Sequence, residues 1–326
     1  MTRYRTFLFG LAALVITEVA LRLVFGLGSP VLSQADPYTG YRFQPNQKVF
    51  RFGKRVEYNS YSQRSDPATR EKPYGTLRIL MLGDSVLNGG NLSDQTKTIS
   101  EKLETKIRSL RQSVEVLNAS AGSWGIGNQL GYLREFGTFQ SDAIILLIGT
   151  HDLVQKTSTS ERVGKDPNYP DHSPASAIQE AMVRYVLPKV TTILNSTPTP
   201  TEILLSTKTS TEDNQQFRTN MKLLQELEDL VKLDRIPIYV VFTANREDLL
   251  PTTKDPKHKQ EFLETLKNLN QPVFDSHRAW SSLPKVVVAS YFRDEVHLTE
   301  TGNEAIASLV FQQFCFRQPS TSCEKR

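Results

Sequence analysis

Cysteine is almost absent from this chain: only 2 of 326 residues, Cys315 and Cys323, and both lie near the C-terminus. Together with 5 histidines they show no zinc-binding spacing, and two thiols are too few for a framework of disulfides. The glycine-rich stretch 122–127 lacks the spacing and the acidic partner of a dinucleotide-binding loop. We therefore expect no metal and no organic cofactor.

An excess of charge of one sign is also missing. The formal net charge is only +4, and the basic residues are scattered, which argues against nucleic acid as a partner. Charged residues make up 23% of the chain and hydrophobic residues 38%, as in an ordinary globular protein. A chain of this length has room for one large domain plus an appendage.

One long hydrophobic run is present, TFLFGLAALVITEVALRLVFGLGS at residues 6–29. As a helix its 24 residues would extend about 36 Å, enough to cross a hydrocarbon core of about 30 Å. Arg3 and Arg5 precede the run, so the positive-inside rule places the N-terminus in the cytoplasm and the rest of the chain outside the cell membrane, in the periplasm. Glu18 and Arg22 lie four residues apart and can pair on one helix face. We predict a cytoplasmic stub and single-pass anchor at residues 1–33.

Two other interpretations of the run remain open. It can be a cleaved signal peptide with its apolar core at Phe7–Ile16 and a small-residue cleavage site at Ser33–Ala35, or an amphipathic helix on the membrane surface. A cleaved signal peptide would export the protein as well. In an exported protein, Cys315 and Cys323 are expected to close a small disulfide loop, and two unrelated thiols are the alternative.

Residues 34–74 differ in composition from the rest and are predicted to form a separate membrane-proximal segment. They are rich in aromatic and basic side chains: Tyr38, Tyr41, Phe43, Phe50, Phe52, Tyr58 and Tyr61, with Arg42, Lys48, Arg51, Lys54 and Arg55. In one interpretation the aromatic residues pack on the domain and the cations meet anionic headgroups. In the other, the aromatic faces stack against sugar rings.

From residue 75 to residue 326, short apolar runs alternate with helical patterns, which predicts one α/β domain with a parallel sheet. The expected strands are Leu77–Leu82, Val114–Asn118, Ala143–Ile148, Glu202–Ser206 and Ile236–Thr243. The expected helices are Thr98–Arg111, Ser173–Leu194, Thr211–Leu233, Asp255–Leu269 and Thr301–Phe314.

A nucleophile is expected where the first of these strands ends. Gly83-Asp84-Ser85 follows the run Leu77–Leu82, so the Ser85 hydroxyl should lie at the carboxyl edge of the sheet, where open α/β sheets carry their sites. Asp294 and His297, three residues apart before the last helix, supply an orienting acid and a general base. The three residues together predict a serine hydrolase.

These motifs resemble those of the SGNH (GDSL) hydrolase superfamily. The block Gly83–Gly89 and the pair Asp294-x-x-His297 match its first and last sequence blocks, and a glycine block falls within Asn118–Gly125. The resemblance implies a flavodoxin-like three-layer α/β/α fold with strand order 2-1-3-4-5. It also implies that Ser85, Asp294 and His297 are catalytic, with an oxyanion hole formed by the N–H groups of Ser85 and Gly122 and by the side chain of residue 151.

The third block departs from the family pattern Gly-x-Asn-Asp, because it reads Gly149-Thr150-His151-Asp152. A histidine can still donate a hydrogen bond to an oxyanion, but with a new pH dependence, expected near 6–7 where imidazole titrates. Alternatively, His151 points away from the site, or hydrolysis has been lost.

The predicted function is that of a membrane-anchored extracytoplasmic serine esterase. The expected substrate is an O-acyl group, such as acetyl, on an envelope or exopolysaccharide glycan. One alternative is an O-acyltransferase that uses the same triad and acyl-enzyme. Another is a catalytically weak glycan-binding or assembly protein.

Overall fold

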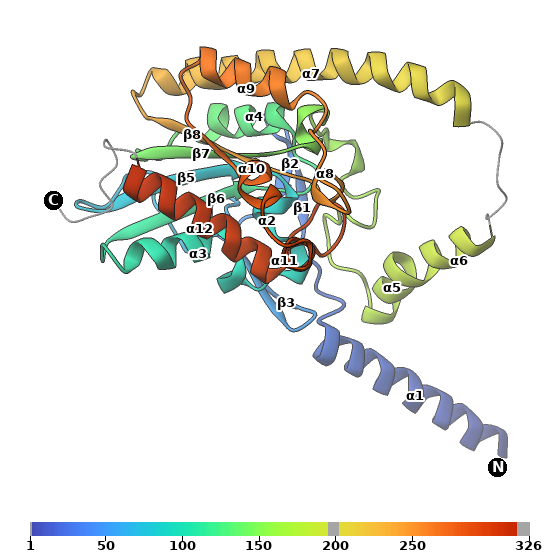
Figure 1. Cartoon of the computed structure of the whole chain (residues 1–326). Helices are drawn as coiled ribbons and strands as arrows, with labels where there is room; N and C mark the ends of the chain where they lie inside the picture. The colour runs from blue at the N-terminus through green and yellow to red at the C-terminus, as the bar shows by residue number, and fades with distance from the viewer. Residues whose placement is uncertain (1, 195–201, 318–326) are drawn as a thin grey trace.

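The computed structural model describes residues 2–194 and 202–317 (Figure 1). Its centre is a parallel sheet of five strands in the order β6-β5-β7-β8-β9, which is the order 2-1-3-4-5 along the chain. The strands are β5 (Leu77–Gly83), β6 (Val114–Ser120), β7 (Ala143–Gly149), β8 (Ile238–Thr243) and β9 (Val273–Asp275). The predicted α/β fold class is therefore confirmed.

Helices cover both faces of this sheet, so the domain has three layers (Figure 1). Successive residues of a strand point to opposite faces of the sheet. Because helices cover both faces, β5 is buried along its whole length. Ile79 and Met81 enter the core under α3 and α12, whereas Leu80 and Leu82 enter the core under α4, α7 and α9. The helices of the domain are α2 (Ser85–Asn88), α3 (Ile99–Arg108), α4 (Ile126–Phe136), α5 (Ala177–Ala181), α6 (Leu187–Leu194), α7 (Glu202–Lys232), α8 (Arg246–Leu249), α9 (Lys259–Asn268), α10 (Ser276–Ser281), α11 (Lys285–Tyr291) and α12 (Glu300–Arg317).

One predicted strand is wrong. Glu202–Ser206 begins the long helix α7, and the strand that follows β7 in the sheet is β8. An apolar run this short has no periodicity that separates a strand from a buried helical turn. The last strand, β9, was not predicted, because its three residues are too few to form a recognisable pattern.

The segment 34–74 packs on the domain. It contains two antiparallel hairpins, β1 (Ser33–Asp36) with β2 (Gly40–Phe43), and β3 (Gln47–Arg51) with β4 (Lys54–Tyr58). Tyr41 is buried in the core under α4, and Tyr58 is buried beside Val56, whereas Tyr38 and Phe50 are exposed. The burial of Tyr41 and Tyr58 therefore favours the interpretation in which the aromatic residues of this segment pack on the domain.

The N-terminal helix α1 (Thr2–Phe25) projects away from the sheet (Figure 1). Its part Tyr4–Phe25 is long and apolar enough to cross a membrane, and none of it is buried in the protein. At the other end of the chain, Cys315 is disulfide-bonded. Its expected partner, Cys323, lies outside the described residues.

Candidate active site

Three strand ends meet at the carboxyl edge of the sheet. Gly83 of β5 pairs with Ser120 of β6, and β7 ends beside them at Gly149. A Cβ on Gly83 would lie 2.9 Å from the Cβ of Leu87, so this position needs glycine for the chain to turn directly into α2. Asp84 caps that helix by accepting the backbone N–H of Val86 at 2.8 Å. Ser85 thus becomes the first residue of α2, half-buried at the edge of the sheet.

The Ser85 hydroxyl meets His297 across 212 positions of sequence. Its Oγ lies 2.9 Å from His297 Nε2, while His297 Nδ1 lies 2.9 and 3.0 Å from the two carboxylate oxygens of Asp294. With Nδ1–H donating to Asp294, Nε2 is left to accept the Ser85 proton. The structure thus brings the three predicted residues into one hydrogen-bonded row.

A tight loop between α11 and α12 orients the acid and the base. The backbone N–H groups of Val296 and His297 donate to Asp294 Oδ1 at 3.0 and 2.7 Å. Burial raises the pKa of Asp294, but these N–H donors and His297 outweigh burial and hold the pKa below its usual value. Asp294 therefore stays ionised behind the histidine, although its side chain is 49% exposed.

The backbone N–H groups of Ser85 and Gly122 are the candidate donors to an oxyanion at this edge of the sheet. Among the residues that the structure describes, neither the N–H of Ser85 nor that of Gly122 donates a hydrogen bond. Gly122 follows the end of β6, and its carbonyl accepts a hydrogen bond from the buried Tyr41 hydroxyl. Trp124 Nε1 donates to the carbonyl of Tyr41 at 2.8 Å. The segment 34–74 thus helps to position the loop that carries Gly122.

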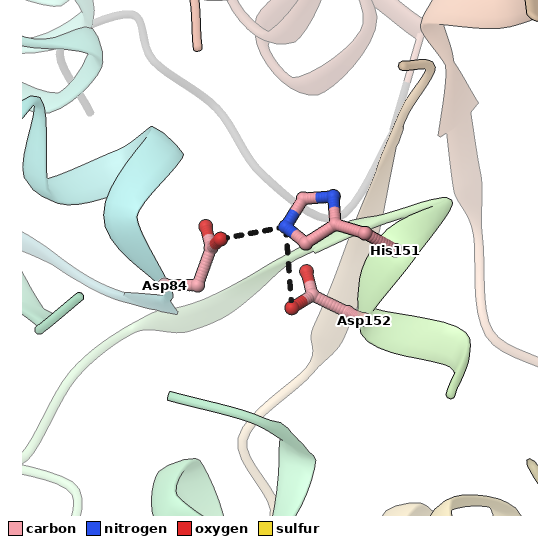
Figure 2. A group of neighbouring side chains, drawn as sticks. All are labelled: Asp84, His151 and Asp152. Carbon is pink, nitrogen blue, oxygen red and sulfur yellow. Dashed lines mark hydrogen bonds and ion pairs between the residues drawn. The ribbon is translucent and has the colours of Figure 1, made fainter. Parts of the chain in front are cut away.

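His151 lies between two buried carboxylates (Figure 2). Its Nε2 is 2.8 Å from Asp84 Oδ2 and 3.6 Å from Asp152 Oδ1, and its Nδ1 is 3.0 Å from Asn245 Oδ1. Both ring nitrogens thus face acceptors of the protein, which favours the doubly protonated imidazolium. The carboxylate oxygens of Asp84 and Asp152 and the ring nitrogen of His151 all lie within 4.8 Å of one another.

The charges of this cluster move the titration of His151 away from neutral pH. Burial lowers the pKa of His151, but Asp152 and Asp84 outweigh burial and raise the pKa to about 10. The expected titration near 6–7 is therefore wrong. Burial also raises the pKa of Asp152 to about 7, whereas His151 holds the pKa of Asp84 below its usual value. Whether His151 contributes to the oxyanion hole stays a prediction.

Sequence reasoning missed the residue that supports the turn after Ser85. Arg64 is completely buried, and its guanidinium donates to the carbonyl oxygens of Asn88, Gly90 and Ser93, the last two at 2.6 Å. A lone arginine in an irregular segment gives no sequence signal of such a role. Its donors satisfy the carbonyl of Asn88 at the end of α2 and those of Gly90 and Ser93 beyond it.

Replacing Arg64 with leucine should lower the free energy of unfolding by about 3 kcal/mol, because three carbonyl groups, two of them in buried hydrogen bonds, lose their donor. The measurement is denaturant unfolding of the full-length protein in detergent. Arg55→Leu is the matched control, since the Arg55 side chain is 51% exposed, and it should change stability by less than about 0.5 kcal/mol. Equal stabilities of the two variants would contradict this role of Arg64.

A model of the GDSL-like lipase/acylhydrolase family matches residues 79–310. Among solved structures, a lipolytic protein of the G-D-S-L family from Veillonella parvula is 14% identical, with 74% of this chain and 100% of that chain covered and a TM-score of 0.43. A lipase/acylhydrolase from Enterococcus faecalis is 14% identical, with 76% and 100% covered and a TM-score of 0.43. A search of curated proteins found no match.

Proposed function

We propose a function for this chain, which belongs to the GDSL-like lipase/acylhydrolase family. In this proposal Ser85, His297 and Asp294 are the catalytic triad of a membrane-anchored serine esterase. Membership of this family makes the protein an ester-bond hydrolase. The observation that carries the proposal is the row of hydrogen bonds from Ser85 Oγ through His297 to Asp294, at 2.9 Å each. We further propose that α1 anchors the chain in the cell membrane, with the domain on the periplasmic side.

The geometry supports a two-step acyl transfer. His297 Nε2 takes the hydroxyl proton as Ser85 Oγ attacks the ester carbonyl, and Asp294 stabilises the imidazolium that forms. The backbone N–H groups of Ser85 and Gly122 bind the oxyanion. The alcohol then leaves with the proton from Nε2, and an acyl-enzyme on Ser85 remains. Water, with His297 again taking the proton, then attacks the acyl-enzyme, which releases the carboxylic acid and restores Ser85.

We propose that His151 acts as a positioning residue through Asp84. Ser85 Oγ lies 3.2 Å from Asp84 Oδ2, which is a second acceptor for the hydroxyl proton besides His297. His151 donates to that same Oδ2 at 2.8 Å. The charged ring therefore competes with Ser85 for Asp84 and favours the conformation in which the hydroxyl points to His297.

The proposed substrate is an O-acetylated glycan of the cell envelope. The support is the open position of the site, since the side chains of Asp294 and His297 are 49% and 33% exposed, which suits a polymer better than a buried acyl chain. The full-length protein in detergent should cleave p-nitrophenyl acetate faster than the octanoate ester and release acetate from O-acetylated polysaccharide.

Other outcomes of this experiment identify other functions. Preference for the octanoate ester would contradict a glycan O-acetyl substrate and indicate a lipid. Transfer of acetyl to added unacetylated glycan, without release of acetate, would identify an acyltransferase. Glycan binding without any ester turnover would leave only a binding protein.

A further inference from the structure

Helix α5 begins against the side of the N-terminal helix. Glu18 of α1 accepts the backbone N–H groups of Ala177 and Ile178 at 2.9 and 3.0 Å, and thereby caps the first turn of α5. The same carboxylate pairs with Arg22 at 2.6 Å. The two helices leave the domain at the same corner (Figure 1). These contacts hold the start of α5 at the level of Glu18 along α1.

That position lies within the apolar part of α1. Glu18 precedes the last residue of the helix, Phe25, by seven residues, which is about 10 Å along the axis. The apolar part Tyr4–Phe25 extends about 33 Å, little more than a hydrocarbon core of about 30 Å. If α1 spans the bilayer, the start of α5 therefore lies at or below the headgroup layer.

A buried ion cluster fixes the orientation of the helix that follows. Helical structure continues from α5 through the π-helical turn Met182–Val186 into α6. Glu180, which is only 3% exposed, accepts the N–H of Gly28 at 2.6 Å and pairs with Arg51 and Arg184. This side of the helix is therefore attached to Gly28 after α1 and to Arg51 of β3.

The other side carries exposed apolar residues. Their spacing of three and four residues is that of one helix face, and they are Met182, Val183, Val186, Leu187 and Val190, each between 38% and 47% exposed. We call these five residues the α5–α6 face. Exposed Lys189 lies on the same stretch, where a long cationic side chain can reach lipid phosphate.

We propose that the α5–α6 face lies in the lipid–water boundary of the membrane that α1 spans. This inference rests on the anchoring role of α1 in the proposed function. The occupant is a bilayer, because the Glu18 cap places the start of α5 at membrane depth and the apolar face continues directly from it. Two attachments, α1 and this face, would then fix the orientation of the domain on the membrane. With α1 alone, the domain could rotate relative to the membrane surface.

The test measures probe depth in the full-length protein, reconstituted in liposomes that contain anionic phospholipid. Single cysteines replace Val186, Phe9 of α1 and Leu233 after α7, and each carries an environment-sensitive fluorophore. Phe9 and Leu233 are 75% and 79% exposed and serve as the membrane and water controls. Cys315 is disulfide-bonded, so labelling is done without reductant, and the unsubstituted chain gives the background. Ester turnover of each variant checks its folding.

Quenchers attached to the lipid chains should quench the Val186 probe nearly as much as the Phe9 probe and several times more than the Leu233 probe. Quenching at Phe9 but not at Val186 would overturn this inference and leave the anchor intact. Quenching at neither position would overturn the anchor as well. A Val186 probe shielded from water without quenching would mean that a protein surface, such as a second copy of the chain, covers the face, and this too would overturn the inference.

Discussion

Replacing Ser85 with alanine should lower kcat/KM for p-nitrophenyl acetate by about 10⁴- to 10⁶-fold. The substitution removes the oxygen that lies 2.9 Å from His297 Nε2, so no acyl-enzyme can form. The free energy of unfolding should change by less than about 0.5 kcal/mol, because the side chain of Asp84, not that of Ser85, caps α2. Steady-state kinetics and denaturant unfolding of the same preparation measure both quantities.

The matched control is Ser109→Ala. Ser109 is an exposed serine at the end of α3, whose hydroxyl contacts the carbonyl of Lys106, and the same atoms are removed far from the sheet edge that carries Ser85. This variant should keep wild-type turnover. If Ser85→Ala, shown to be folded, retained more than about a hundredth of wild-type turnover, Ser85 would not be the nucleophile.

The sequence allowed the elements around the nucleophile to be predicted because each signal is local. The strand Leu77–Leu82, the turn at Ser85 and the pair Asp294 and His297 are all continuous in sequence, and the structure has a strand, a helix start and a loop at these positions. Burial on both faces explains why the strand stood out as an uninterrupted apolar run.

The cluster around His151 could not be predicted in the same way. Asp84, His151 and Asn245 follow three different strands, and their contacts depend on side-chain directions at the sheet edge that no local pattern encodes. Without those contacts, the sequence predicts only the titration of an unperturbed imidazole. Arg64 was missed for a related reason: its three carbonyl acceptors lie 24 to 29 residues further along the chain.

Replacing His151 with asparagine should lower the free energy of unfolding by about 3–5 kcal/mol near pH 8, because Asp84 and Asp152 stay buried without their cation. Since the pKa of His151 in the folded protein is raised to about 10, its contribution is lost as the pH rises through about 10. As the pH falls, the variant recovers stability, because burial raises the pKa of Asp152, the lost His151 no longer lowers it, and protonation removes an uncompensated buried charge. The difference from wild type should therefore be largest near neutral pH, decline as the pH rises from about 6.5 toward 10, and be lost above it.

Denaturant unfolding at about pH 5, 8 and 10.5 measures this profile. His172→Asn is the matched control, since the His172 side chain is 81% exposed, and it should unfold like the wild type. Adding Asp152→Asn to His151→Asn should restore part of the lost stability, because one of the two buried charges disappears while the amide oxygen still accepts the N–H of Gly149. A constant difference at all three pH values would contradict the charged state of His151.

Turnover of His151→Asn separates the two roles considered for this residue, because only one of them predicts a loss. If His151 acts through Asp84, the substitution frees Asp84 Oδ2 to accept the Ser85 hydroxyl proton, and kcat/KM should fall by about 10²-fold. If His151 is instead an oxyanion donor, the asparagine amide restores the donor of the family pattern, and kcat/KM should be kept or rise. We expect the fall, because both ring nitrogens already face protein acceptors. A rise in turnover would show that the ring leaves Asp84 when substrate binds.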